Sequence, residues 1–540
     1  MSELLNVQIN GEWKKFPKGT RLIDACAIEG QDIPHFCYHE KLSIAGNCRM
    51  CMVELGMPKM TPDRKPVLGV DGFPEIAWSP KPAIACATDI SEGMGVRTDS
   101  PVVVEARQAT LEFLLLNHPL DCPICDQAGE CTLQEYAIQY GKTSSRIGDD
   151  KKIKKPKRIE IGPRIMYDGE RCVLCGRCVR FMREVAKDDA LGFAQRGTHS
   201  FIAAAPCKPL DSNYSLNTVD LCPVGALTAK DFRFQMRTWF LKETKTIDVH
   251  CGLGSNITVS SRENTIYRVT PRENPDVNNC WLPDSHRLAF HDDVHASDRL
   301  VEPFVPALSD DKKNNWIRAI EAAAKQMQAA NGRLALIASA SLTCEELYMV
   351  KRIADAFKIE DFDVLPRPQQ GDGLLVSNDG NANTRGAQVL ALTTEKLPQI
   401  ASRIASGDIK TLVVIGEDAT KCGIATEQLD ALESLIVIAT RANETTRRAS
   451  VLLPMTSWAE KCGTLVNING RIQRLNAILD PLGDSRRLWR ILRDLLHEIF
   501  VHAKYEDFSH VFAEMVATVP SFEGLTLEKI GDLGIEIECK

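Results

Sequence analysis

The sequence predicts a multidomain protein with a cysteine-rich α+β front and an α/β back. Of the 19 cysteines among 540 residues, fifteen lie before residue 281 and four after it. Beyond Phe304, short apolar runs alternate with amphipathic segments, as in a doubly wound α/β layer. A chain of this length exceeds a single core and is expected to divide into about three to five domains.

The composition is that of an ordinary globular protein, with 44% hydrophobic and 25% charged residues. A formal net charge of -7 argues against a nucleic-acid binder, which needs a basic surface to neutralise phosphates. No apolar run reaches the roughly 18 residues that span a bilayer, and residues 1–7 lack the layout of a secretion signal. We therefore expect an intracellular chain, in which closely spaced cysteines are metal ligands or redox thiols.

Residues 5–16 predict a β-hairpin, because two strand-like runs flank the turn Asn10-Gly11. Thr20 is placed to cap a short helix that runs to Glu29. Hairpin, helix and a following cysteine loop are typical of a β-grasp ferredoxin. Four thiols follow, at Cys37, Cys48, Cys51 and Cys86. They can hold a 2Fe-2S cluster. The gap between Cys37 and Cys48 is longer than the corresponding gap in plant-type ferredoxins, and zinc is the competing metal.

A second group of metal-ligand residues follows a helix predicted over residues 102–117. The apolar face of that helix is predicted to contain Ala106, Ala109, Phe113 and Leu116. The helix leads into H-x3-C-x2-C-x5-C, formed by His118, Cys122, Cys125 and Cys131. Three thiolates and an imidazole are also a normal zinc set, and a single histidine is often only a surface or core residue. Because a 4Fe-4S cluster needs four ligands and no fourth cysteine is near, we predict that His118 completes such a site.

The third group has the most specific spacing. Cys172, Cys175 and Cys178 form C-x2-C-x2-C, and the remote Cys222 precedes Pro223. This pattern is typical of one 4Fe-4S cluster in a ferredoxin-like fold. The basic stretch 151–158 just before it is expected to be a solvated loop or a docking patch, since no aromatic residues are interleaved with it.

These three motifs, in this order, resemble the large iron-sulfur subunit of respiratory complex I, the NADH:quinone oxidoreductase. The resemblance covers residues 1 to about 240. It implies one 2Fe-2S cluster and two 4Fe-4S clusters held by the twelve residues of these motifs, and it favours iron over zinc. Similar front ends occur in subunits of NAD-linked hydrogenases and formate dehydrogenases, which are the alternative assignment.

The segment from Thr246 to Val269 resembles the small cluster domain that opens the molybdopterin oxidoreductases. Some complex I subunits keep four cysteines here for another 4Fe-4S cluster, but Asp248 and Ser255 stand at two of those positions. Only Cys251 and Cys280 remain, so we predict no cluster there and expect two packed thiols.

The back half predicts parallel strands over residues 334–338, 412–415 and 435–439, and a capped helix from Thr343 to Phe357. Residues 453–473 resemble the pterin-domain signature of molybdopterin enzymes. Because no further cysteine ligand lies between Cys280 and Cys344, we predict a degenerate domain without molybdopterin. A catalytic formate dehydrogenase and a purely structural metalloprotein are the two other hypotheses.

The domains are expected to be a 2Fe-2S domain at 1–100, the one-His/three-Cys domain at 101–145, the ferredoxin-like domain at 146–242, a degenerate cluster domain at 243–300 and the molybdopterin-oxidoreductase-like α/β domain at 301–540. No flavin or nicotinamide site and no catalytic residue is predicted, since Gly371-Asp372-Gly373 is too short to be a dinucleotide motif.

The resemblance implies a role in relaying electrons from a flavin subunit toward quinone. The implied partners are the flavoprotein subunit and its small 2Fe-2S companion, the eight-iron ferredoxin-like subunit and the quinone-site subunits, with membrane contact only through the complex. The implied location is the peripheral arm on the cytoplasmic side of a bacterial inner membrane, with the mitochondrial matrix as the alternative.

Overall fold

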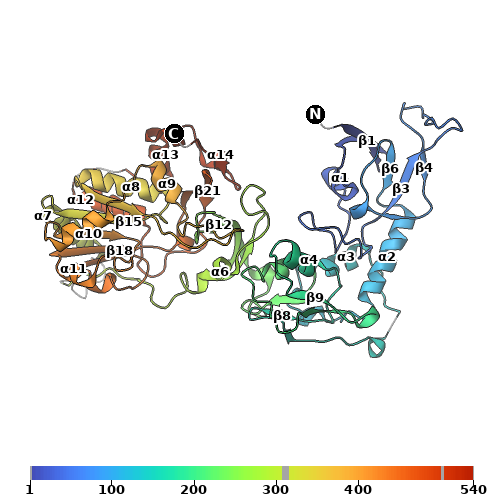
Figure 1. Cartoon of the computed structure of the whole chain (residues 1–540), viewed down its shortest axis with the longest axis horizontal. Coiled ribbons are helices and arrows are strands. Elements are labelled where there is room, and N and C mark those ends of the chain that lie inside the picture. Colours follow the sequence, from blue (N-terminus) through green and yellow to red (C-terminus); the bar gives the residue numbers. More distant parts are fainter. Residues whose placement is uncertain (1–2, 147, 307–314, 500, 502–503, 539–540) are drawn as a thin grey trace. The chain divides into compact units, whose positions relative to one another are not determined.

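The computed structural model describes residues 3–146, 148–306, 315–499, 501 and 504–538. The chain divides into two compact units, residues 1–240 and 241–540 (Figure 1). Cys539, for which the sequence suggested no metal role, lies outside the described residues. Among the described residues, no helix combines the length and the apolar character needed to cross a membrane.

The first unit opens with a β-grasp sheet. Its strands lie in the order β2-β1-β6-β3-β4, with β5 paired to β3. The hairpin turn is confirmed, because Asn10 and Gly11 both have positive φ, 49° and 95°, as a two-residue turn requires. The bounds are β1 (Leu4–Ile9), β2 (Glu12–Pro17), α1 (Leu22–Ile28), β3 (Met52–Pro58), β4 (Ile76–Trp78), β5 (Ala83–Ile84), η1 (Ala85–Ala87) and β6 (Met94–Arg97).

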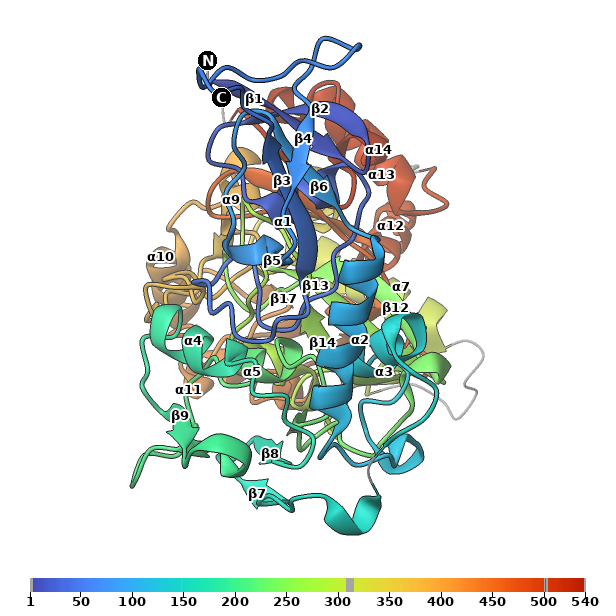
Figure 2. The same ribbon diagram turned by 90° about the vertical axis from the view of Figure 1, so that its right-hand side faces the viewer.

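Two predictions for helices of the first unit are wrong, the cap of α1 and the buried face of the next helix. Thr20 does not cap α1, which begins after Arg21 without a side-chain cap; the Thr20 hydroxyl instead donates to the Pro17 carbonyl. The second concerns the helix α2 (Pro101–Leu115), which packs against β3 and α3 (Thr132–Tyr140) (Figure 2). Its buried residues are Val103, Arg107 and Leu111, whereas Phe113 is 77% exposed.

The rest of the first unit consists of short elements around one longer helix, α4. Two small antiparallel sheets, β11-β8-β7 and β10-β9, lie beside it. The bounds are η2 (Cys122–Ile124), η3 (Asp149–Lys151), β7 (Ile159–Glu160), β8 (Ile165–Tyr167), α4 (Arg177–Glu184), β9 (Leu191–Ala194), η4 (Gly197–His199), β10 (Phe201–Ala204), α5 (Asn217–Asp220), β11 (Leu227–Ala229) and η5 (Thr238–Phe240).

The second unit confirms the predicted α/β layer. Its central sheet is fully parallel, in the order β16-β15-β17-β18-β19, which is a doubly wound topology. Alternate strand residues pack on opposite faces: α7, α8 and α12 cover one face, and α10 and α11 cover the other (Figure 1). The bounds are α7 (Asn315–Ala329), β15 (Leu334–Ser339), α8 (Cys344–Ala356), β16 (Asp361–Leu365), α9 (Thr384–Val389), α10 (Leu397–Ala405), β17 (Thr411–Ile415), α11 (Thr426–Asp430), β18 (Ser434–Ala439), β19 (Val451–Pro454) and α12 (Leu488–Glu498).

The predicted helix cap is confirmed, because Thr343 and Glu346 form a reciprocal capping box at the start of α8. Two smaller sheets complete the unit, β12-β13-β14 and β20-β21-β22. The remaining bounds are β12 (Lys242–Ile247), β13 (Asn256–Arg262), β14 (Thr265–Pro271), α6 (Asp284–Arg287), η6 (Ala289–His291), η8 (Thr446–Arg448), η9 (Trp458–Glu460), β20 (Gly463–Val466), β21 (Arg471–Leu475), α13 (Phe508–Thr518), η10 (Pro520–Phe522), α14 (Leu527–Ile530) and β22 (Ile535–Glu536).

Candidate metal centres

The four thiols of the first predicted site meet at one point of the β-grasp domain. Cys37 and Cys48 lie in the loop after α1, Cys51 lies just before β3, and Cys86 lies in η1. Cys37 accepts hydrogen bonds from Cys48 and Cys86, and Cys51 accepts one from Cys86. These hydrogen bonds hold the pKa of Cys37 below its usual range and raise those of Cys48 and Cys86. A group of thiols that shares protons in this way fits a cation that replaces the protons.

Two arginines on α4 hold the loop of this site in place. Arg180 donates to the carbonyl oxygen of Cys37, and Arg177 donates to that of Tyr38. The loop also contacts the third site, since Asn47 Nδ2 donates to the Leu174 carbonyl over 3.1 Å. Sequence reasoning missed both arginines, although their spacing of three on one helix was a usable signal.

The third predicted site is a small cavity of about 20 Å³, and its lining includes Cys172, Cys175, Cys178 and Cys222. Burial disfavours the thiolates, so the pKa of Cys175 rises to about 11 and that of Cys222 to about 12. Four thiols around one cavity, two of them buried and two half-buried, fit a 4Fe-4S cluster, whose irons would deprotonate the thiols outright. Tyr167, whose hydroxyl accepts a hydrogen bond from the Ile202 amide at 3.0 Å, also lines the cavity.

The second predicted site is more open. Cys125 and Cys131 are buried and Cys122 is exposed; burial, together with the nearby Cys125 and Cys122 thiols, raises the pKa of Cys131. His118 is half-buried; burial first, and then the Arg171 cation, lowers its pKa to about 4. It is therefore neutral, the form in which histidine binds metals. The charges of Arg171 and Asp121 influence the pKa values of both His118 and Cys125. The ligand role of His118 stays a prediction.

Contrary to expectation, the basic stretch before the third site is not uniformly solvated. Lys152 is only 8% exposed, and its ammonium donates to the carbonyl oxygen of His118 over 2.8 Å. Arg171, next to Cys172, forms a bidentate ion pair with Asp121, next to Cys122, at 2.7 and 3.0 Å. Arg171 thus connects the third site to the second, Lys152 binds the backbone of the second site, and neither contact follows from the cysteine spacing.

A single backbone segment separates the second and third sites. The Pro223 carbonyl accepts from the Thr132 amide over 3.1 Å and lies 3.9 Å from the Cys131 sulfur. At Gly225 a β-carbon would lie only 2.6 Å from the Cys125 sulfur. Glycine is required here because the segment that carries Cys222 passes directly over a thiol of the neighbouring site.

Family models match five stretches of the chain. They are a 2Fe-2S iron-sulfur cluster binding domain at residues 2–101, the NADH-ubiquinone oxidoreductase-G iron-sulfur binding region at 107–146, the NADH-quinone oxidoreductase subunit 3 ferredoxin-like domain at 162–228, the NADH-ubiquinone oxidoreductase NDSU1/NuoG-like 4Fe-4S domain at 241–291 and molybdopterin oxidoreductase at 363–498. The chain thus contains 2Fe-2S and 4Fe-4S binding domains, and iron-sulfur chemistry is favoured over zinc at the first three sites.

Curated relatives carry names of the same kind. The NADH-quinone oxidoreductase G subunit of Rickettsia felis is 35% identical over 77% of this chain and 60% of its own length. NADH dehydrogenase (ubiquinone) iron-sulfur protein 1, mitochondrial, of Solanum tuberosum is 42% identical over 56% of this chain and 38% of its own length. NADH-quinone oxidoreductase subunit 3 of Thermus thermophilus is 35% identical over 74% of this chain and 53% of its own length.

The chain therefore spans between about two fifths and three fifths of the length of these relatives. A solved NAD+-reducing NiFe-hydrogenase in the H2-reduced state shares 26% identity over 43% of this chain and 91% of that chain, with a TM-score of 0.36, too low for a comparison of folds. The order of the family models and the names of the relatives agree, and the chain belongs to the family of the large iron-sulfur subunit of complex I, which is also called its 75 kDa subunit.

Proposed function

We propose that this chain is an electron-transfer subunit of NADH:quinone oxidoreductase, relaying electrons from a flavin subunit through iron-sulfur centres toward quinone. The observation that carries the proposal is that the three groups of predicted ligands adjoin one another within one compact unit. A relay needs such neighbours, whereas a chain with unrelated structural metals does not.

The proposed cofactors are one 2Fe-2S cluster on Cys37, Cys48, Cys51 and Cys86, one 4Fe-4S cluster on His118, Cys122, Cys125 and Cys131, and one 4Fe-4S cluster on Cys172, Cys175, Cys178 and Cys222. When bound, such clusters accept and release single electrons.

The protein's own contribution lies in burial and in charge around these ligands. Most of the thiols are buried, which keeps water away from them. Arg177 and Arg180 bring two cations to the loop that carries Cys37. Positive charge favours an added electron, so we expect both arginines to raise the reduction potential of the first site.

The contacts between the sites suggest how the relay is built. Asn47 and Leu174 connect the first site to the third, and the segment from Cys222 to Gly225 connects the third to the second. Only a few bonded or hydrogen-bonded atoms separate neighbouring ligands along this path. The third site thus contacts each of the other two, and the loop of the first site also contacts α3 of the second through the hydrogen bond from the His35 amide to the Tyr136 hydroxyl at 3.3 Å.

The partners of the proposed relay are other components of the complex. They are the flavoprotein subunit with its small 2Fe-2S companion, the eight-iron ferredoxin-like subunit and the quinone-site subunits. The proposed location is the peripheral arm at the cytoplasmic side of a bacterial inner membrane. We also propose five domains, with limits after residues 100, 145, 242 and 300, and a C-terminal domain that serves as scaffold without molybdopterin or flavin.

Iron counting combined with electron paramagnetic resonance tests the proposal. The anaerobically purified chain is expected to hold about ten irons, and reduction by NADH through the flavoprotein subunit is expected to give one 2Fe-2S signal and 4Fe-4S signals. A chain that holds zinc in place of iron, or clusters that stay oxidised under these conditions, would contradict the proposed role.

The assignment of His118 has its own test. His118→Ala should remove one 4Fe-4S signal and leave the other signals in place. His199→Ala, at an exposed position of η4, is the matched control and should change none of them. An unaltered spectrum of the His118 variant would exclude this histidine as a ligand.

A further inference from the structure

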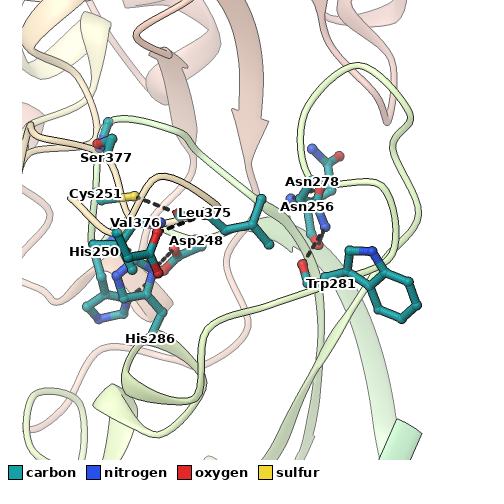
Figure 3. Close-up of polar contacts among 12 residues, drawn as sticks. Asp248, His250, Cys251, Asn256, Asn278, Trp281, His286, Leu375, Val376 and Ser377 are labelled. Atoms are coloured by element: carbon teal, nitrogen blue, oxygen red, sulfur yellow. Dashed lines mark hydrogen bonds and ion pairs between the residues drawn. The ribbon is translucent and has the colours of Figure 1, made fainter. Parts of the chain in front are cut away.

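Residues 248–293 of the second unit contain a buried polar network that none of the three sites uses. Asp248 follows β12, His250 and Cys251 lie in the next turn, and His286 lies on α6. Both histidines point toward the Asp248 carboxylate (Figure 3). One Asp248 oxygen is 2.6 Å from His250 Nδ1, and the other is 2.7 Å from His286 Nδ1.

Three donor atoms of different chemistry converge in this network. A carboxylate oxygen of Asp248, the sulfur of Cys251 and a ring nitrogen of His286 all lie within 4.8 Å of one another. The three residues are only 2%, 0% and 9% exposed. The Cys251 sulfur lies 3.7 Å from the Leu375 carbonyl, a weak contact that leaves the thiol available as a ligand (Figure 3).

We propose that Asp248, Cys251 and His286 bind one zinc-type divalent cation. One thiolate, one imidazole and one carboxylate form a borderline-soft donor set, which suits Zn²⁺ better than Mg²⁺ or Ca²⁺. In a tetrahedral site such ligand atoms stand about 3.3 to 3.6 Å apart. The distance from Asp248 to His286 is 2.7 Å and all three donor atoms lie within 4.8 Å of one another, so small side-chain rotations would bring them to these distances.

Binding would exchange protons for the cation. The metal would take the place of the hydrogen on His286 Nδ1, the imidazole would keep its one ring proton on Nε2, and the Cys251 thiol would lose its proton to solvent. His250 holds the free carboxylate oxygen of Asp248, while its other ring nitrogen lies 3.0 Å from Asp293, which in turn accepts from Trp458 at 2.9 Å. Such a chain of outer hydrogen bonds orients a metal ligand.

The site differs from the 4Fe-4S cluster that the matching family model describes for residues 241–291. A cubane needs four thiolate or imidazole ligands, whereas this segment offers a carboxylate at 248 and a hydroxyl at 255. Zinc has no redox chemistry, so the ion would not relay electrons but would fasten the turn after β12 to α6. The inference is independent of the proposed electron relay.

Metal analysis of the full-length chain tests the site. After equilibration with buffered Zn²⁺, the wild type should hold one zinc per chain, and Cys251→Ser should lower the zinc content at least tenfold. Cys280→Ser is the matched control, because Cys280 belongs to the cluster pattern but not to the three converging donors. It should keep its zinc; loss of about four irons in this control would show a cluster instead and overturn the proposal.

Co²⁺ substitution covers the case in which Cys251→Ser fails to fold. Cobalt bound to the wild-type site should show a thiolate-to-metal charge-transfer band in the near ultraviolet and strong tetrahedral bands in the visible. His286→Gln should weaken both, with far-ultraviolet circular dichroism as the check on folding. A wild-type chain that takes up neither zinc nor cobalt at this site would refute the proposal.

Discussion

In residues 1–240, buried thiols lie next to other thiols. In residues 241–540, buried acidic and basic side chains form ion pairs. Around the third site, four cysteines line one cavity. In the second unit Arg299 Nη2 donates to both carboxylate oxygens of Glu460, and Lys461 lies 2.6 Å from Glu346, with all these side chains at most 7% exposed.

The two units differ in what balances their buried polar groups. Buried thiolates are costly without a cation, which fits the proposed replacement of the thiol protons by metal in the first unit. The buried ion pairs of the second unit neutralise each other directly. The network around Asp248 combines both arrangements, because it places a thiol among paired acids and bases.

The largest expected effect is the loss of a whole cluster from the first unit. Cys178→Ser removes a thiol that is buried in the cavity of the third site. We expect about four of about ten irons to be lost, together with one 4Fe-4S signal. Cys207→Ser, which changes an exposed cysteine, is the control and should keep all the iron. If both variants held the same iron, the third site would not be a cluster site.

The next largest effect concerns a buried charge in the second unit. Arg299→Met leaves Glu460 charged and 2% exposed without its partner, which should cost about 3 to 5 kcal/mol of the free energy of unfolding. Hydrogen exchange of the peptides around residue 299, as a function of urea, measures this loss. The iron content should not change, because no thiol is involved.

Lys410→Met is the comparison, since it breaks an ion pair whose carboxylate, Glu433, is 66% exposed. It should cost less than about 1 kcal/mol. Equal losses for the buried and the surface pair would contradict the view that the second unit depends on its buried pairs.

Glu345 provides a pH test of the same unit. Burial raises its pKa from 4.5 to about 7, even though the Thr464 amide and hydroxyl donate to it. The folded state therefore holds this proton more tightly than the unfolded state. Stability should fall as the pH rises from 4.5 to 7, by roughly 3 kcal/mol. Glu345→Gln should abolish that decline in unfolding curves, and an unchanged pH dependence would remove Glu345 as its cause.

The smallest effect probes the boundary between the second and third sites. Gly225→Ala places a β-carbon 2.6 Å from the Cys125 sulfur, so we expect a loss of about 1 to 3 kcal/mol and a changed line shape of the second 4Fe-4S signal. Gly192→Ala is the control, because a β-carbon there meets nothing within 4 Å. Identical spectra and melting temperatures for both variants would show that this close approach is unimportant.

The sequence predicted the elements whose causes are local. Asn10-Gly11 specifies a two-residue turn, and Thr343 with Glu346 specifies a helix start, because the interacting groups are a few residues apart. Its predictions of burial were wrong where segments far apart in the sequence decide which side chains are covered. Phe113 was expected on a buried face, but β3 and α3 pack against another side of the helix and leave it exposed. Lys152 was expected in solvent, yet the His118 carbonyl binds it.

For the metal centres, the sequence alone indicated groups of metal-binding thiols, since the number and spacing of thiols depend only on the order of residues, and the family resemblance favoured iron over zinc. It could not show that Arg177 and Arg180 hold the first loop, that Gly225 passes over Cys125, or that Asp248, Cys251 and His286 converge. Those relations join residues that lie between three and more than one hundred positions apart. Only folding brings them within contact distance, because hydrogen bonds and ligand bonds act over a few ångströms, whatever the separation along the chain.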